Sequence, residues 1–204
     1  MRGRKVTPKV RDGKVQKKNR HQWTEFQELL DQETFSTIKM KPQEGYIHVV
    51  DRKSALKFVK LIPDWEDMSK GLSALVPDID GCNHQTDMNY YPNSYNSIWL
   101  SPFPKDMTLY WPKEFGEGHK EVTDLLGIEQ EEIDDEEIKT VWTKPKAQAW
   151  QLLHLFLYDL YCHHECMLQG KDNYHHSDKL AEEYAIKTSA IILPDYEKVV
   201  GRFY

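Results

Sequence analysis

The longest apolar run in the chain covers residues 147–168, AQAWQLLHLFLYDLYCHHECML. It contains no Gly or Pro, and it lies between Pro145 and Gly170, residue types that favour a helix start and a helix end. Its large apolar side chains point in nearly every direction around a helix, so we expect protein to cover most of its surface. The run therefore predicts a buried central helix that organises the rest of the fold.

The polar residues of this predicted helix are not scattered around it. At about 100° per residue, one stripe contains five of them: His154, Tyr158, Tyr161, Cys162 and Glu165. Asp159 and His163 point to the other side. A buried helix with one polar stripe lines a cleft or joins a buried polar network, so His154 and Glu165 are candidate binding residues.

Shorter patterns predict the elements that surround this helix. Helices are predicted at residues 21–35, 54–61, 112–127 and 179–192, and strands at residues 45–50, 97–100 and 138–143. His119 lies on the polar side of its predicted helix, where we expect a surface role. Seven acidic residues at positions 129–137 predict a solvated loop or the acidic first turn of a helix. This mixture predicts an α+β fold, with a small mixed sheet packed on helices.

Charge separates the first 20 residues from the rest of the chain. Residues 1–20 contain nine Lys or Arg and one acidic residue, whereas the whole chain has a net charge of −6. Because this segment has almost no large apolar residues, we expect a disordered basic arm followed by a single domain at residues 21–204. A solvated arm is the favoured interpretation, and nucleic-acid binding through phosphate neutralisation is the alternative.

Composition also bears on the membrane association and the redox compartment of the protein. The apolar runs are too short or too interrupted by polar groups to span a bilayer, so we expect no membrane partner. The three cysteines, an odd number without framework spacing, indicate free thiols in a reducing compartment. These features favour a cytoplasmic protein.

The segment Leu153–His164, followed by Ala181–Ala185, resembles the active-site region of zincin-type metallopeptidases. Members of that family carry His-Glu-x-x-His on a buried helix, and the gluzincin-like branch takes a third ligand, a carboxylate, from the next helix. Two imidazoles at i and i+4 can share one zinc ion, and the Glu beside the first polarises the bound water. The resemblance implies a zincin-like fold, with Ser97–Leu100 as the edge strand above the cleft.

At the motif itself this chain reads YDLYC, residues 158–162. The resemblance places Tyr158 and Cys162 at the two imidazole positions, Asp159 at the general-base position and Glu182 at the third ligand. Tyr is a poor zinc ligand because the pKa of its phenol is about 10, whereas Cys ligates as a thiolate. Asp is one methylene shorter than Glu. Only the Glu182 position is intact, so the motif is degenerate.

Three arrangements of these groups stay open. The favoured one has no cofactor, and the polar stripe forms a hydrogen-bonded network. The second is a zinc site, either Cys162 with Glu182 helped by His163 or His164, or Cys162 and Cys166 completed by Glu182 and His175 or His176. The third is another histidine-based site.

The leading functional interpretation is a non-catalytic zincin-like protein whose remnant cleft binds a peptide or protein partner. The first alternative is an active metal-dependent hydrolase with a relocated Cys/His/Glu ligand set. The second is a nucleic-acid-associated protein that uses residues 1–20.

Overall fold

The computed structural model describes residues 10–11, 14–15, 35–37, 40–78, 89–91, 96–170 and 177–203. Its central sheet has the strand order β3-β5-β7-β6. β3, β5 and β7 run parallel, and β6 is antiparallel to β7. The strands are Ser36–Thr37 (β3), Ala74–Pro77 (β5), Asn89–Tyr91 (β6) and Ser97–Leu100 (β7). The predicted strand at 97–100 is confirmed, but it is not an edge strand, because β5 and β6 flank it on both sides.

The connection from β3 to β5 carries most of the N-terminal half of the fold. α2 (Arg52–Phe58) begins after Asp51, whose side chain accepts a hydrogen bond from the backbone N–H of Ser54 at 2.7 Å. A 3-10 turn η1 (Val59–Leu61) and α3 (Trp65–Met68) follow. β4 (Tyr46–Ile47), within the predicted strand at 45–50, pairs with β8 (Phe103–Pro104).

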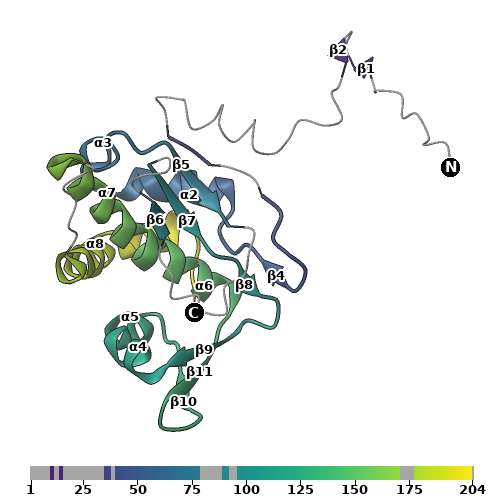
Figure 1. Ribbon diagram of the computed structural model, residues 1–204, viewed down its shortest axis with the longest axis vertical. Helices are drawn as coiled ribbons and strands as arrows, with labels where there is room; N and C mark the ends of the chain where they lie inside the picture. Colours follow the sequence, from purple (N-terminus) through teal and green to yellow (C-terminus); the bar gives the residue numbers. More distant parts are fainter. Residues whose placement is uncertain are drawn as a thin grey trace.

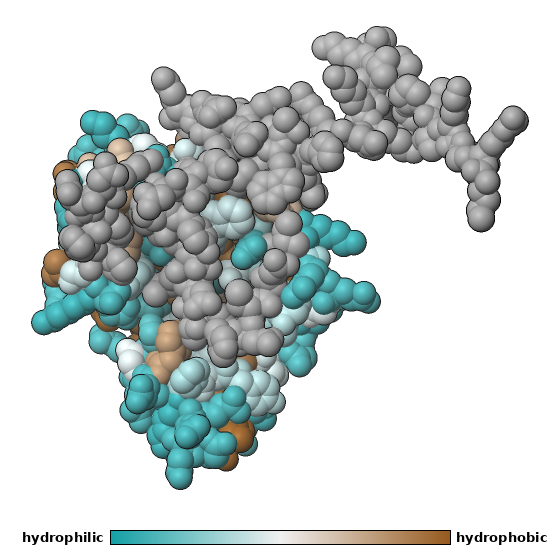
Figure 2. Space-filling view, viewed as in Figure 1, coloured by the Kyte–Doolittle hydropathy of each residue, from teal (hydrophilic) through white to brown (hydrophobic). Residues whose placement is uncertain are grey.

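A second, antiparallel sheet has the order β10-β11-β9. It is built from Thr108–Pro112 (β9), Gln130–Glu132 (β10) and Glu137–Val141 (β11). Two short helices, α4 (Lys113–Gly118) and α5 (Lys120–Leu125), connect β9 to β10. Figure 1 shows this sheet and its helices at one end of the molecule, and the surface of that end is mostly hydrophilic (Figure 2).

The acidic segment 129–137 differs from its prediction as a loop or a helix turn, because it forms β10 and the turn into β11. The carboxylate of Asp134 accepts hydrogen bonds from the backbone N–H groups of Glu136 and Glu137, each at 2.8 Å, and these close the turn. Across the two strands, the ammonium group of Lys139 lies 2.9 Å from the carboxylate of Glu131. Opposite charges on facing strands reduce the repulsion on which the prediction rested.

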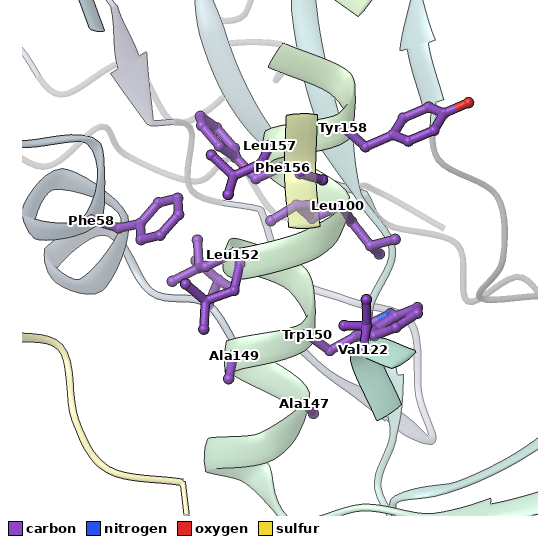
Figure 3. Packing of buried hydrophobic residues seen from close by; sticks show 14 of the residues in the cluster. Phe58, Leu100, Val122, Ala147, Ala149, Trp150, Leu152, Phe156, Leu157 and Tyr158 are labelled. Carbon is purple, nitrogen blue, oxygen red and sulfur yellow. The ribbon is translucent and has the colours of Figure 1, made fainter. Parts of the chain in front are cut away.

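The predicted central helix is confirmed as a helical run, but it is not uniform. α6 (Lys144–Trp150) leads into the π-helical segment η2 (Gln151–Phe156), and α7 (Leu157–Gln169) follows. All six residues of η2 are buried. Figure 3 shows Leu152 and Phe156 directed toward Phe58 of α2, and Trp150 beside Val122 of α5. The central run therefore packs against helices that connect strands in both sheets.

The last helix, α8 (Asp178–Val199), packs along α7 and η2 (Figure 1). The side chain of Ser177 caps its first turn by accepting from the N–H of Leu180. We expected the helix to end before Pro194, but it continues to Val199. Proline removes the N–H that would bond to the carbonyl of Ala190, and Ala190 is exposed, so water can satisfy that carbonyl instead.

The fold is α+β, and one hydrophobic cluster joins both sheets to the helices. Among the described residues, no helix is long and apolar enough to cross a membrane. The helix predicted at 21–35 lies outside the described residues except for Phe35. Of the predicted basic arm, the described residues are Val10–Arg11 (β1) and Lys14–Val15 (β2), which pair antiparallel.

Candidate metal centre

Three elements that are distant in sequence bring His119, His154 and Glu182 together. His119 is the single residue between α4 and α5, His154 lies in η2, and Glu182 lies near the start of α8. One potential ligand atom of each side chain lies within 4.8 Å of the other two. Within the described part of the chain, no other three His, Cys, Asp or Glu side chains meet in this way.

The ring of His119 is held in a defined orientation. Its Nδ1 lies 2.8 Å from the carbonyl oxygen of Phe115, and because a carbonyl only accepts, Nδ1 must carry the proton. The other ring nitrogen, Nε2, therefore keeps its lone pair. The imidazole also stacks on the ring of Phe115, with centroids 4.0 Å apart. Metal-binding histidines are oriented by this kind of backbone hydrogen bond.

His154 is a fully buried imidazole without a hydrogen-bond partner on either ring nitrogen. Burial, together with the neighbouring His119, lowers its pKa to about 3. The ring is therefore neutral at physiological pH, with one N–H and one lone pair left unsatisfied. Because buried polar groups are nearly always paired, this side chain needs an explanation. A cation bound at Nε2 would supply one partner.

Glu182 lies next to this imidazole, with Oε2 3.6 Å from Nε2 of His154. Burial, together with the charge of Glu121, raises the pKa of Glu182 to about 7. Between pH 3 and 7 the histidine is unprotonated and the carboxyl group holds its proton. The short separation is therefore a contact between neutral groups rather than an ion pair.

Two neutral imidazoles and one carboxylate form a recognised metal-binding set. Catalytic zinc sites use three such protein ligands and leave a fourth position for water, and non-haem Fe(II) sites use the same donors. Bonds of about 2.1 Å in tetrahedral geometry place ligand atoms about 3.4 Å apart. The contact between His154 and Glu182 is close to this spacing, so the set could close around an ion through small side-chain movements.

The other residues of the predicted site lie elsewhere on α7. The hydroxyl of Tyr158 donates a hydrogen bond to the carboxylate of Asp178, and burial raises the pKa of its phenol. Asp159 is buried, its Oδ2 has no partner, and burial raises its pKa well above the usual range, which favours the protonated carboxyl group. Tyr158 and Asp159 are therefore not members of the three-residue cluster.

The predicted alternates also lie outside that cluster. Cys162 and Cys166 are buried, and neither forms a disulfide. His175 and His176 lie outside the described residues. Nε2 of His163 lies 3.0 Å from the carbonyl oxygen of Lys70, and Glu165 accepts a hydrogen bond from Gln169 at 3.0 Å. His164 is half-buried. Of the residues named from the sequence, the structure thus brings together His154 and Glu182.

His119 is the member of the cluster that the sequence pattern missed. The segment 112–127 was predicted as one helix with His119 on its solvent side, but the helix breaks at this residue and turns the imidazole inward. The nearby glycines, Gly116 and Gly118, were the available signal for a break. Gly116 is required for packing, because a Cβ there would lie 1.9 Å from Cδ1 of Ile138 in β11.

Comparisons of this chain with protein-family models, with curated proteins and with solved structures found no match. The resemblance to zincins therefore stays a prediction, and the function is inferred from the site itself.

Proposed function

We propose that the chain is a metal-dependent hydrolase whose zinc ion is held by His119, His154 and Glu182. The single observation that carries this proposal is the burial of two neutral imidazoles beside a carboxylate, one of them without a hydrogen-bond partner. Such a group is costly in a metal-free fold and suited to a divalent cation. Three ligands leave one coordination position for water, which a bound zinc ion activates for hydrolysis.

In this proposal, different residues orient the ligands, exclude water and leave access to solvent. The hydrogen bond from His119 to Phe115 fixes which nitrogen faces the ion. The aromatic ring of Trp150, with its centroid 4.5 Å from that of His154, excludes water from the inner side of the site. Glu182 is 26% exposed, so solvent reaches the centre from the side of α8. Glu121 is exposed, and its charge contributes to the raised pKa of Glu182.

The predicted non-catalytic zincin-like role is the second candidate. Asp159, at the general-base position of the resemblance, is buried, its pKa is raised by that burial, and it does not belong to the cluster. A zincin-type base is therefore lacking, and the remnant cleft would then bind a peptide or protein partner without hydrolysis.

Zinc titration of the metal-free full-length protein tests the proposal. We expect one zinc ion per chain, and we expect His119→Ala, His154→Ala and Glu182→Gln each to weaken binding by more than about 100-fold, since losing a ligand costs more than losing its outer partner. His164→Ala, on the same helical run but outside the cluster, is the matched control and should bind zinc as the wild type does.

Activity is measured on the zinc-loaded protein with peptide, ester and phosphoester substrates. Hydrolysis that disappears in the three ligand variants supports the hydrolase. Stoichiometric zinc without hydrolysis overturns the hydrolase, and a wild-type protein that takes up no divalent metal overturns the zinc site and favours the non-catalytic role.

A further inference from the structure

His154 lies in a segment whose backbone is not a regular α-helix. In an α-helix the N–H of Leu157 would donate to the carbonyl of Leu153, four residues earlier. Here it donates to the carbonyl of His154 instead. At the end of η2 the N–H of Leu157 thus bonds three residues back, so the backbone hydrogen bonding departs from the α-helical pattern beside the candidate ligand. π-helical turns occur mostly as single insertions in α-helices, frequently at functional sites.

A side chain from the neighbouring helix forms a hydrogen bond to the backbone of this segment. The hydroxyl of Ser189, in α8, donates a hydrogen bond to the carbonyl oxygen of Leu153. Ser189 is 4% exposed and Leu153 is 1% exposed, so water does not compete for this contact. Because the N–H of Leu157 bonds to His154 and not to Leu153, the hydroxyl supplies the Leu153 carbonyl with a buried donor, which favours the observed form of the segment over a regular helix.

The form of the segment determines where the imidazole points. A π-helical turn holds one more residue than an α-helical turn, so its removal would rotate His154 by about 100° relative to α6 or to α7. Such a rotation would separate Nε2 of His154 from Glu182, which now lie 3.6 Å apart in different helices.

Two hydrogen bonds also connect α8 to the central run on either side of Glu182. Asp178, one helical turn before Glu182, accepts from Tyr158, and Ser189, two turns after it, donates to Leu153. Both contacts fix the height of α8 against η2 and α7, and with it the position of the carboxylate.

We propose that Ser189 is a positioning residue of the centre, whose hydroxyl holds the π-helical turn that directs His154 toward Glu182. This inference rests on the proposed metal-binding function for its functional consequence. The residue itself does not touch the ion.

The test compares Ser189→Thr with Ser189→Val in the full-length protein. Thr and Val have nearly the same shape, so both add the same crowding, but only Thr keeps the hydroxyl. We expect the Val variant to bind Co²⁺ about 10–100-fold more weakly than the Thr variant, as for the loss of other groups that orient a ligand. The visible absorption of bound Co²⁺ should also change, because a misdirected imidazole alters the coordination geometry.

Ser97→Ala is the control for a lost buried hydroxyl. Ser97 is fully buried in β7 and accepts a hydrogen bond from the indole N–H of Trp99 at 2.8 Å. It should lower stability without changing the Co²⁺ affinity or spectrum, which separates positioning from general destabilisation.

A second measurement separates this inference from the proposed function. In the metal-free protein, nuclear Overhauser contacts between the His154 ring and Glu182 report the direction of the ring without any ion. Loss of these contacts in the Val variant and not in the Thr variant supports the positioning role, even if the wild type binds no metal and the proposed function fails. Unchanged contacts and equal Co²⁺ binding in the two variants overturn it, whether or not the protein binds metal.

Discussion

His154 and Glu182 are both held in their neutral forms, and this has opposite consequences for stability at the two ends of the pH range. His154 has a folded-state pKa of about 3, below the 6.5 of an exposed imidazole. The unfolded chain therefore binds more protons between pH 3 and 6.5, and the folded state loses stability as the pH falls through this window. Glu182 has a folded-state pKa of about 7, above its ordinary 4.5, so stability is lost as the pH rises from 4.5 to 7.

We predict that Glu182→Gln stabilises the metal-free protein at pH 8 relative to the wild type, and that the gain disappears at pH 4. Each unit of pKa difference corresponds to about 1.4 kcal/mol, and partial solvent exposure reduces the effect, so the gain should be about 1–3 kcal/mol. Urea unfolding at a series of pH values measures it. A gain that is the same at pH 4 and pH 8 would show that protonation of Glu182 is not its cause.

We also predict that zinc binding strengthens as the pH rises to about 7 and then levels off. The proton on Glu182 competes with the ion, whereas the imidazole of His154 is already unprotonated and burial lowers the pKa of His119. Calorimetric titrations between pH 5.5 and 8 in two buffers of different ionisation enthalpy give the number of protons released. Release of no proton at pH 6 would contradict the assigned state of Glu182.

At the scale of the elements, the apolar pattern predicted well where burial alone decides the structure. The central run was expected at 147–168 and extends over the residues of α6, η2 and α7, because its many Leu and Phe side chains must be covered. The π-helical form of η2 was not predictable from periodicity, since one of its carbonyls, that of Leu153, bonds to Ser189, which is 36 residues away. The strand β10, within the acidic segment 129–137, was not predicted because it depends on pairing with β11. That pairing includes the contact between Glu131 and Lys139, which the pattern within one strand does not report.

The same distinction holds for the candidate site. His154 and Glu182 were identified because each lies in a clear helix and the resemblance had assigned a role to Glu182. His119 depended on the close approach of α4 to β11 at Gly116, which no helical pattern reports. The third ligand comes from a different pair of helices, so the spacing of ligands along one helix does not predict it.

The close contact between α4 and β11 at Gly116 leads to a prediction. Gly116→Ala should lower the free energy of unfolding by about 1–3 kcal/mol, because the new methyl group overpacks the buried side chain of Ile138. Since α4 ends at the residue before His119, the displaced helix should also weaken zinc binding. Gly118→Ala is the control: its added Cβ has no atom within 4 Å, and it should change neither property. Urea unfolding and zinc titration of both variants provide the comparison.

At the scale of the whole molecule, the three candidate ligands come from two separate parts of the fold. His119 belongs to the helices connected to the second sheet, whereas His154 and Glu182 belong to the helical layer against the central sheet (Figure 1). An ion at this point would join these parts by coordination bonds in addition to apolar packing. Metal binding should therefore change the local stability of α4 and α5 more than that of distant elements.

Hydrogen exchange measures this difference. We predict that saturating zinc slows amide exchange in α4 and α5 well beyond its effect on the β4–β8 pair, which contributes no ligand. Equal slowing throughout the described residues would indicate general stabilisation rather than a bridge between the two parts.

The thiols of Cys162 and Cys166 have a practical consequence. Both are buried in α7, one helical turn apart, and neither is bonded to another cysteine. An alkylating reagent can reach them only when this helix separates from its neighbours, so their rate of modification, resolved by peptide mapping, reports how often that happens. The native chain thus contains its own probe of the opening of the helix that follows His154.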